Sequence, residues 1–370
     1  MALTHSRCIR FRFSASILCS LLLTTLFPVA IAQAQPAPQA SPAKPTSQII
    51  ATDLIVTDQS GHRVTNLQAG DFTVLDNGTP RKILAFQPPN VVVSAAGKPV
   101  TPDVVDIVLD NVNTPDLRIA YIRQCTEDFL RMNGGKLDTP VAIYHFDQQG
   151  ITLVAGPSTD GNQLAAQLHA SEAAERPYLK IEGFYNDTDR LSASLNAVGA
   201  FLAHQATQPG HKLFVWIGRG WPLMMNTQTF ADRKQEQTFF TTLTALLSAS
   251  RHSRTTFYSV ESARSAGERT VEWESYAMYL KPVTNPMHTP VGSFSVQVLS
   301  LKTGGVAFAF SGATDLAGTI ARGYADANKS YFLAFASPLD GKPDEYHSLE
   351  IQANKPGLTV RTRTGFYSGQ

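Results

Sequence analysis

The sequence predicts an α/β protein in which a doubly wound, mostly parallel sheet is joined to a small β-sandwich. Three observations predict this fold class. Apolar strands alternate with helical stretches over residues 103–328, short strands and turns fill residues 48–87, and the same β pattern returns over residues 329–368. Alternating strands and helices are typical of a parallel sheet covered by helices, whereas short strands separated by turns indicate antiparallel structure.

The beginning of the chain has the features of a secretory signal peptide. Three arginines precede an apolar run from Ile17 to Ile31, which ends in the small-residue pattern Ala32-Gln33-Ala34. This run is shorter than the ~20 apolar residues that a membrane-spanning helix needs, and Pro28 interrupts it. We therefore expect residues 1–34 to be removed, no transmembrane helix in the mature chain, and a secreted, periplasmic or cell-envelope location.

Charge and cysteine content limit the kinds of partner and of stabilisation. The chain has 31 Lys and Arg against 30 Asp and Glu, and loss of the three arginines of residues 1–34 leaves 28 against 30, a net charge of −2. This balance gives no electrostatic reason to expect nucleic acid as a partner. Cys125 is the only cysteine beyond residue 34, so the exported chain has no internal disulfide and depends on its hydrophobic core.

The N-terminal β segment follows a Pro-rich linker. Residues 35–47 contain four prolines among Ala, Gln and Ser, a composition that favours extended chain. Ordered structure is expected from Ile49, with a first strand over Ile49–Val56. A hairpin is then predicted in which Phe72–Leu75 and Lys82–Phe86 flank the turn at Asn77-Gly78, because Asn-Gly is a strong hairpin signal.

The central segment is predicted to alternate strands with helices. Its first buried strand is Val104–Asp110, and the next helix is expected to have Thr114 as its N-cap, Pro115 as its first residue and Met132 as its end. The inner face of that helix is predicted to carry Leu117, Tyr121, Cys125 and Phe129. Further strands are expected at Val141–Phe146, Ile151–Val154, Leu213–Ile217, Phe257–Val260 and Val306–Phe308. Further helices are expected at Leu164–His169, Leu191–Ala206, Phe230–Ser250, Phe294–Leu301 and Asp315–Ala327.

The C-terminal segment returns to strands, which are predicted over residues 331–335, 346–353 and 358–362. An isolated hairpin or two is marginal without more sheet to pack on. Both terminal β segments have this need, so we expect residues 48–87 and 329–368 to form one β-sandwich that is interrupted by the 103–328 domain.

Several motifs in this order make the sequence similar to a known family. They are Val105–Asp110 followed by Asn113-Thr114, the strand and turn Leu213–Pro222, the tail Gly357–Arg361 with Thr364–Tyr367, and the N-terminal Val64–Leu67, Asp71-Phe72 and Asn77-Gly78. Over about residues 48–368 the chain resembles the von Willebrand factor type A (VWA) related proteins typical of Acidobacteria. The resemblance implies an exported, Rossmann-like α/β domain of the integrin-insert type, most relatives of which bind proteins rather than catalyse.

The same resemblance implies a place for a metal-ion-dependent adhesion site. Such a site uses an Asp-x-Ser-x-Ser loop, a Thr from a second loop and an Asp from a third, because oxygen ligands suit Mg²⁺. Asp110 and Thr114 match the first loop, but Val112 has no side-chain oxygen. Thr188 matches the second loop, and Arg219 stands in the third loop, where the pattern has an acid.

Two of the five ligand positions are therefore lost, and we interpret the site as degenerate. One interpretation keeps weak Mg²⁺ binding through Asp110, Thr114 and Thr188, and the other makes Asp110 a loop-ordering carboxylate and Thr114 a helix cap. Arg219 is expected either to face Asp110 as a built-in cation or to point to solvent. The predicted partner-binding pocket consists of Asp110, Asn113, Thr114, Asp187, Thr188 and Arg219.

The motif search favours binding over catalysis. No Gly-x-Ser-x-Gly elbow, phosphate loop or Gly-x-Gly-x-x-Gly turn follows a predicted strand. The aromatic residues Trp273, Tyr276 and Tyr279 are predicted to belong to the core rather than to an exposed patch. We predict a module that binds an unidentified protein, without catalysis and without a cofactor other than Mg²⁺. Two alternatives stay open: a metal-assisted hydrolase at the strand-end pocket, and a scaffold whose β-sandwich binds carbohydrate or the cell envelope.

Overall fold

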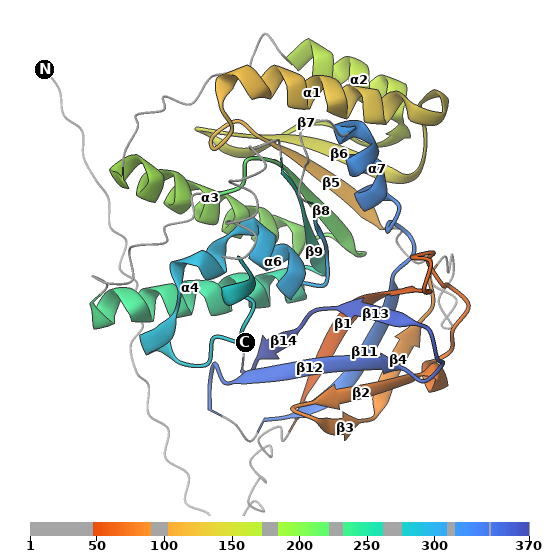
Figure 1. Cartoon of the computed structure of the whole chain (residues 1–370), viewed down its shortest axis with the longest axis vertical. Coiled ribbons are helices and arrows are strands. Elements are labelled where there is room, and N and C mark those ends of the chain that lie inside the picture. Colours follow the sequence, from red (N-terminus) through yellow and green to blue (C-terminus); the bar gives the residue numbers. More distant parts are fainter. Residues whose placement is uncertain are drawn as a thin grey trace, which may run out of the picture. The chain divides into compact units, whose positions relative to one another are not determined.

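The structure is a computed structural model (Figure 1) that describes residues 47–89, 103–171, 184–221, 232–261, 276–308, 315–339 and 342–369. The chain divides into Met1–Lys44 and Pro45–Gln370, and all described residues belong to the second unit. The predicted signal peptide and nearly all of the predicted linker lie outside the described residues. None of the helices in the described ranges is long and apolar enough to cross a membrane.

The central segment forms a six-stranded sheet in the order β10-β9-β8-β5-β6-β7. Its strands are β5 (Val104–Asp110), β6 (Lys136–Asp147), β7 (Gly150–Asp160), β8 (Lys212–Gly218), β9 (Thr255–Glu261) and β10 (Ala307–Phe308). All neighbouring strands are parallel except β6 and β7, which form an antiparallel hairpin. The prediction of a mixed α/β fold with a mostly parallel sheet is confirmed.

Helices cover both faces of this sheet (Figure 1). One face carries α1 (Asp116–Arg131), α2 (Gly161–Ala170) and α7 (Leu316–Tyr324), and the other carries α3 (Phe184–Gln205), α4 (Arg233–His252) and α6 (Val296–Lys302). Alternation along β5 explains the two layers, since Ile107 and Leu109 enter the core under α1 whereas Val108 enters the core under α3. By the same alternation, Asp106 and Asp110 lie on the α3 face.

Helix α1 differs from its predicted form in two respects. Its N-cap is Pro115 rather than Thr114, with extended backbone angles of φ −60° and ψ 141°. Tyr121 is 38% exposed and lies against the guanidinium of Arg118, whereas Ile122 is buried. Cys125 and Phe129 of the predicted inner face are buried as expected. Positions four residues apart rotate by about 40° per step on a helix of 3.6 residues per turn, so Tyr121 lies off the core side.

The two ends of the chain form two four-stranded antiparallel sheets, in the orders β13-β1-β11-β4 and β14-β12-β2-β3. The strands are β1 (Ser47–Thr57), β2 (Phe72–Asp76), β3 (Thr79–Arg81), β4 (Ile83–Gln87), β11 (Tyr331–Pro338), β12 (Tyr346–Ala353), β13 (Thr359–Thr362) and β14 (Gly365–Tyr367). Ile50 pairs with Phe335 in the first sheet, and Val74 pairs with Ile351 in the second. All four side chains are buried in one core. Strand β1 begins at Ser47, two residues before the predicted start of order.

The predicted hairpin of Phe72–Leu75 with Lys82–Phe86 is wrong in its second strand. Strand β2 pairs with β3 across Asn77-Gly78, whose φ angles of 50° and 75° suit a two-residue hairpin turn. Strand β4 instead pairs with β11 in the other sheet. Pro80 offers no N–H to the ladder, so β3 is a poor strand to extend, and the chain leaves this sheet after Arg81.

The aromatic segment near the end of β9 is described only in part. Tyr276 is 3% exposed, in agreement with the predicted core role. Trp273 lies outside the described residues.

Candidate functional site: the carboxyl edge of the parallel strands

Asp110 is the last residue of β5 and lies at the carboxyl edge of the parallel strands, where sheets of this kind usually bind ligands. Its side chain is buried, and its carboxylate accepts backbone N–H groups of Val112 at 3.1 Å and Asn113 at 2.8 Å. The Asn113 Nδ2 group donates to the same carboxylate at 3.0 Å, and the Trp216 Nε1 group donates at 3.0 Å. These donors are all neutral. Those of Val112 and Asn113 belong to the loop that follows Asp110, so the carboxylate holds its own loop in shape.

The protonation of Asp110 reflects this closed environment. Burial raises its pKa to about 6, although the hydrogen bonds from Asn113 and Trp216 favour the ionised form and lower the pKa. A neighbouring guanidinium would shift the pKa further downward.

Asn113 connects the loop to α3. Its Nδ2 group also donates to Ser194 Oγ at 3.1 Å, and the Ser194 hydroxyl donates to the Arg190 carbonyl at 2.8 Å. The Oδ1 atom of Asn113 is buried without a hydrogen-bond partner.

Thr114 brings the first loop against the turn that follows β8. Its Oγ1 atom is buried and accepts the backbone N–H of Arg219 at 3.4 Å. A Cβ atom at Gly218 would lie 2.7 Å from Thr114 Oγ1 and 2.7 Å from the Asp110 Cβ atom. Any larger residue would clash with these two side chains, and this explains why position 218 is a glycine.

The remaining predicted site residues do not join Asp110. Val112 is fully buried in the core under α3 and α4. Asp187 and Thr188 lie inside α3, which begins at Phe184, and not in a loop ahead of a helix at Leu191. Asp187 forms an ion pair with Arg190 one turn later in α3, and Thr188 is exposed.

Of the two alternatives for Arg219, the structure favours a side chain that points to solvent over one that faces Asp110. Arg219 is an exposed residue, whereas the Asp110 carboxylate is buried among neutral donors. Gly220 adopts φ 84°, a left-handed conformation that turns the backbone back on itself.

These residues do not fit a magnesium ion. The oxygens of Asp110 are engaged by N–H donors, Val112 is a core residue, and Thr114 Oγ1 accepts a backbone N–H. Within the described residues, no group of three or more His, Cys, Asp or Glu side chains is placed to hold a metal ion.

Sequence reasoning missed the two tryptophans of this edge. Trp216 donates to Asp110 and packs edge-on against Trp221, with ring centroids 5.4 Å apart. The Nε1 atom of Trp221 and the Oε1 atom of Gln297 are buried without a hydrogen-bond partner. A buried indole N–H usually has a hydrogen-bond partner. The two tryptophans that flank Gly218-Arg219-Gly220 could therefore have indicated a hydrogen-bonded cluster at this edge.

Comparisons with known proteins give distant similarity only. No protein-family model matches the sequence, and no curated protein matches it. Among solved structures, the chain is similar to the human COPII-coat protein Sec24c, with 9% identity and a TM-score of 0.32, over 74% of this chain and 45% of that chain. It is also similar to the SpRpn10 VWA domain, with 8% identity and a TM-score of 0.24, over 47% of this chain and 95% of that chain. The chain thus spans less than half of the Sec24c chain. Similarities this weak carry no argument about activity.

Proposed function

We propose that this protein is an exported protein-interaction module that binds its partner at the carboxyl edge of the parallel sheet, without a metal ion and without catalysis. The observation that carries the proposal is the pairing of Asp110 with neutral N–H donors of its own loop and of Trp216. A carboxylate engaged in this way orders a binding loop in advance, which lowers the entropy cost of association.

Arg219 is an exposed residue at this edge, and its side chain suggests the chemistry of the partner. Arg219 extends from a turn whose backbone is held by Thr114 Oγ1. A guanidinium on a rigid turn is suited to bind a carboxylate with two parallel hydrogen bonds, and arginine is frequent at the energetic centres of interfaces. The partner surface is therefore expected to present an acidic side chain to Arg219.

The two alternative functions have weaker support. A metal-assisted hydrolase needs oxygen ligands at the positions that Val112 and Arg219 occupy. A carbohydrate-binding sandwich is expected to expose aromatic rings, but the large exposed apolar side chains in the described part of the sandwich are Ile49 and Leu84. Aliphatic side chains offer no ring face for a sugar.

Metal-independent binding is the first test. The purified protein is first used to capture a partner from an envelope fraction of its source organism. The captured partner is then purified, and its affinity for the protein is measured by calorimetry in millimolar Mg²⁺ and in EDTA. We expect equal affinity in both solutions and no change in Tm, because a weak site adds stability only as RT ln(1 + [L]/Kd). Loss of binding in EDTA, or a shift of several degrees in Tm with Mg²⁺, would restore the metal-dependent adhesion site.

A matched pair of charge reversals locates the surface. Arg219→Glu is expected to weaken binding by roughly tenfold or more, and Lys82→Glu, at an exposed position of the sandwich, is expected to leave binding unchanged. The opposite result, in which only Lys82→Glu weakens binding, would assign the partner to the β-sandwich.

A further inference from the structure

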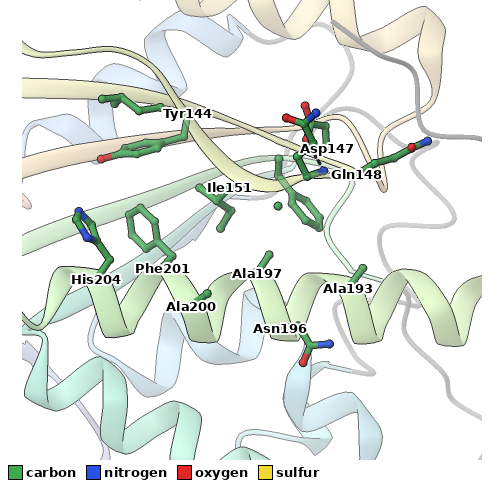
Figure 2. A pocket seen from close by; sticks show the side chains of 14 residues that line it. Tyr144, Asp147, Gln148, Ile151, Ala193, Asn196, Ala197, Ala200, Phe201 and His204 are labelled. Atoms are coloured by element: carbon green, nitrogen blue, oxygen red, sulfur yellow. Dashed lines mark hydrogen bonds between the residues drawn. The ribbon is translucent and has the colours of Figure 1, made fainter. Parts of the chain in front are cut away.

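A groove of about 890 Å³ lies between α3 and the β6–β7 hairpin. Figure 2 shows Ile151 and Ala197 in its middle, with Tyr144, Phe201 and His204 towards one end and Asp147 towards the other. None of the residues of the carboxyl-edge site lines it. An inference about this groove therefore does not rest on the proposed function of that edge.

The groove exists because α3 presents small side chains to large ones on the sheet. Ala193, Ala197 and Ala200 lie at helical spacing on its groove face (Figure 2). The sheet side consists of two cross-strand pairs, Tyr144 with Leu153 and Phe146 with Ile151. An alanine ends at its Cβ atom, so the helix leaves uncovered the apolar surface that these pairs present.

Strand β7 is an edge strand of the six-stranded sheet. Within the described residues its only paired neighbour is β6, so no described strand pairs with the N–H and C=O groups of its other edge. Its register with β6 is regular from Asp147 opposite Gly150 to Tyr144 opposite Leu153. A regular edge of this kind is a template for strand addition.

The first part of this edge lacks the side chains that usually protect sheet edges. Natural edges carry lysine, proline or inward-pointing charges, whereas residues 151–153 read Ile-Thr-Leu. Leu153 is 56% exposed on the groove side. The register with β6 shifts directly after Leu153, and Pro157 further along has no N–H to donate, so the regular part of this edge ends at Leu153.

The lining of the groove selects an uncharged ligand. Of the described residues that line it, one is acidic, Asp147, and none is Lys or Arg. The Asp147 carboxylate already accepts the backbone N–H of Gln149 at 2.8 Å. The middle of the groove is apolar, whereas its ends offer amide, phenol and imidazole groups that hydrogen-bond to polar backbone.

We propose that the free edge of β7 and this groove together bind an extended, uncharged segment of a partner polypeptide, which adds as a seventh strand. Its backbone pairs with residues 151–153, and an apolar side chain enters between Leu153 and the alanines of α3. Main-chain hydrogen bonds supply affinity in this mode of recognition, and the groove supplies specificity.

The probe for this proposal is a displayed library of random peptides about seven residues long, enough for one strand. Selection is carried out on the purified protein and, in parallel, on its Leu153→Lys variant. We expect enrichment of apolar residues at alternate positions on the parent protein only. Equal enrichment on both proteins, or no enrichment on either, would overturn the proposal.

Synthetic versions of an enriched peptide then test the contributions of the β7 edge and of the α3 side of the groove, with affinity measured by fluorescence polarisation. We expect Leu153→Lys and Ala200→Trp each to weaken binding roughly tenfold or more. Leu84→Lys is the matched control, because Leu84 is 52% exposed and lies on β4, the edge strand of another sheet. Each substituted side chain is exposed in the parent, so folding is expected to persist, and far-ultraviolet circular dichroism checks this.

Backbone pairing is tested by methylating alternate amide nitrogens of the peptide, which removes N–H donors and leaves its side chains unchanged. Binding is expected to be lost when the donors that face β7 are methylated. Unchanged affinity would mean that the groove recognises side chains alone, and a parent protein that dimerises until Leu153→Lys separates it would mean that the occupant is a second copy. Both results contradict the proposal.

Discussion

Asp110 has a structural task, because its carboxylate accepts hydrogen bonds from its own loop and from Trp216. Asp110→Ala leaves the indole N–H of Trp216 and two backbone N–H groups buried without an acceptor, so we expect a loss of about 1–3 kcal/mol in the free energy of unfolding. Asp110→Asn keeps an acceptor and is expected to lose less. Urea unfolding measures both.

The control for this prediction is Asp189→Ala, at an exposed position of α3. It is expected to change the free energy of unfolding by less than about 0.5 kcal/mol. An Asp110→Ala variant that unfolds at the same urea concentration as the parent would show that the hydrogen bonds to this carboxylate add no net stability.

Residue types alone identified part of the candidate site at the carboxyl edge of the parallel strands. Asp110, Asn113 and Thr114 lie together because they are neighbours along one loop, and adjacency in sequence made that predictable. The positions of the Arg219 and Trp216 side chains were not predictable in this way, because the direction of a side chain depends on backbone angles and packing. Both Gly218 and Gly220 leave that direction open in the sequence.

At the scale of elements, the two terminal β segments depend on each other. Strand β1 lies between β11 and β13, and the sandwich core takes side chains from both ends of the chain. Removal of residues 329–370 is therefore expected to make residues 47–87 the first site of limited proteolysis, while α1 to α4 resist longer. Mass spectrometry of the fragments measures this order.

A less drastic variant checks the same dependence. Phe335 is fully buried in the sandwich core, so Phe335→Ala is expected to cost about 3–5 kcal/mol and to increase cleavage within residues 47–87. Leu84→Ala, at an exposed position, is the control. Equal protection of residues 47–87 in the parent and in both altered chains would contradict a shared folding unit.

The hairpin near Asn77 shows which element properties are local. The turn itself was predictable, since its left-handed φ angles suit Asn and Gly. The departure of β4 to the other sheet was not, because its partner β11 lies more than 240 residues later, as in the pairing of Phe86 with Leu333. A choice between two partners is decided by burial in the complete core.

At the scale of the whole molecule, buried titratable groups link stability to pH. Burial raises the pKa of Asp106 to about 7, although Lys212 and a hydrogen bond from Tyr144 lower it. The pKa of Asp110 is raised to about 6, and that of His211 is also raised, because Asp53 and Asp103 outweigh the opposing effect of burial. In all three, the folded state holds its proton more tightly than the unfolded chain.

The sign of the pH dependence follows from these shifts. The carboxylates contribute stability that is full below the unfolded pKa of 3.8 and is lost as pH rises through their folded values, and His211 contributes in the same direction above 6.5. We expect the free energy of unfolding to fall between about pH 4 and pH 8.

Asp106→Asn removes the larger of the two carboxylate pKa shifts and tests its share. Its stability relative to the parent is expected to rise with pH across this window, by up to about 4 kcal/mol, and urea unfolding at several pH values measures it. Asp189→Ala again serves as the control. Parallel curves for the parent and Asp106→Asn would show that Asp106 does not carry the dependence.

Asp326 is a buried carboxylate that joins the sandwich to the parallel sheet. Asp326 accepts the hydroxyl of Tyr258 at 2.8 Å and the Nε group of Arg63 at 2.8 Å, and it also pairs with Arg361. These groups come from β9, from the N-terminal β segment and from β13. No local pattern indicates such a joint.

The sequence by itself determined the alternation of strands and helices, the mostly parallel sheet and the Asn77-Gly78 turn. Each of these depends on periodicity or on the backbone preference of neighbouring residues. The tertiary structure alone decided that Trp216 completes the Asp110 site from 106 residues away, that β4 joins β11, and that Leu153 is left at an open sheet edge. Those outcomes depend on which distant side chains share a core, and the free energy of burial is settled only when the whole chain has packed.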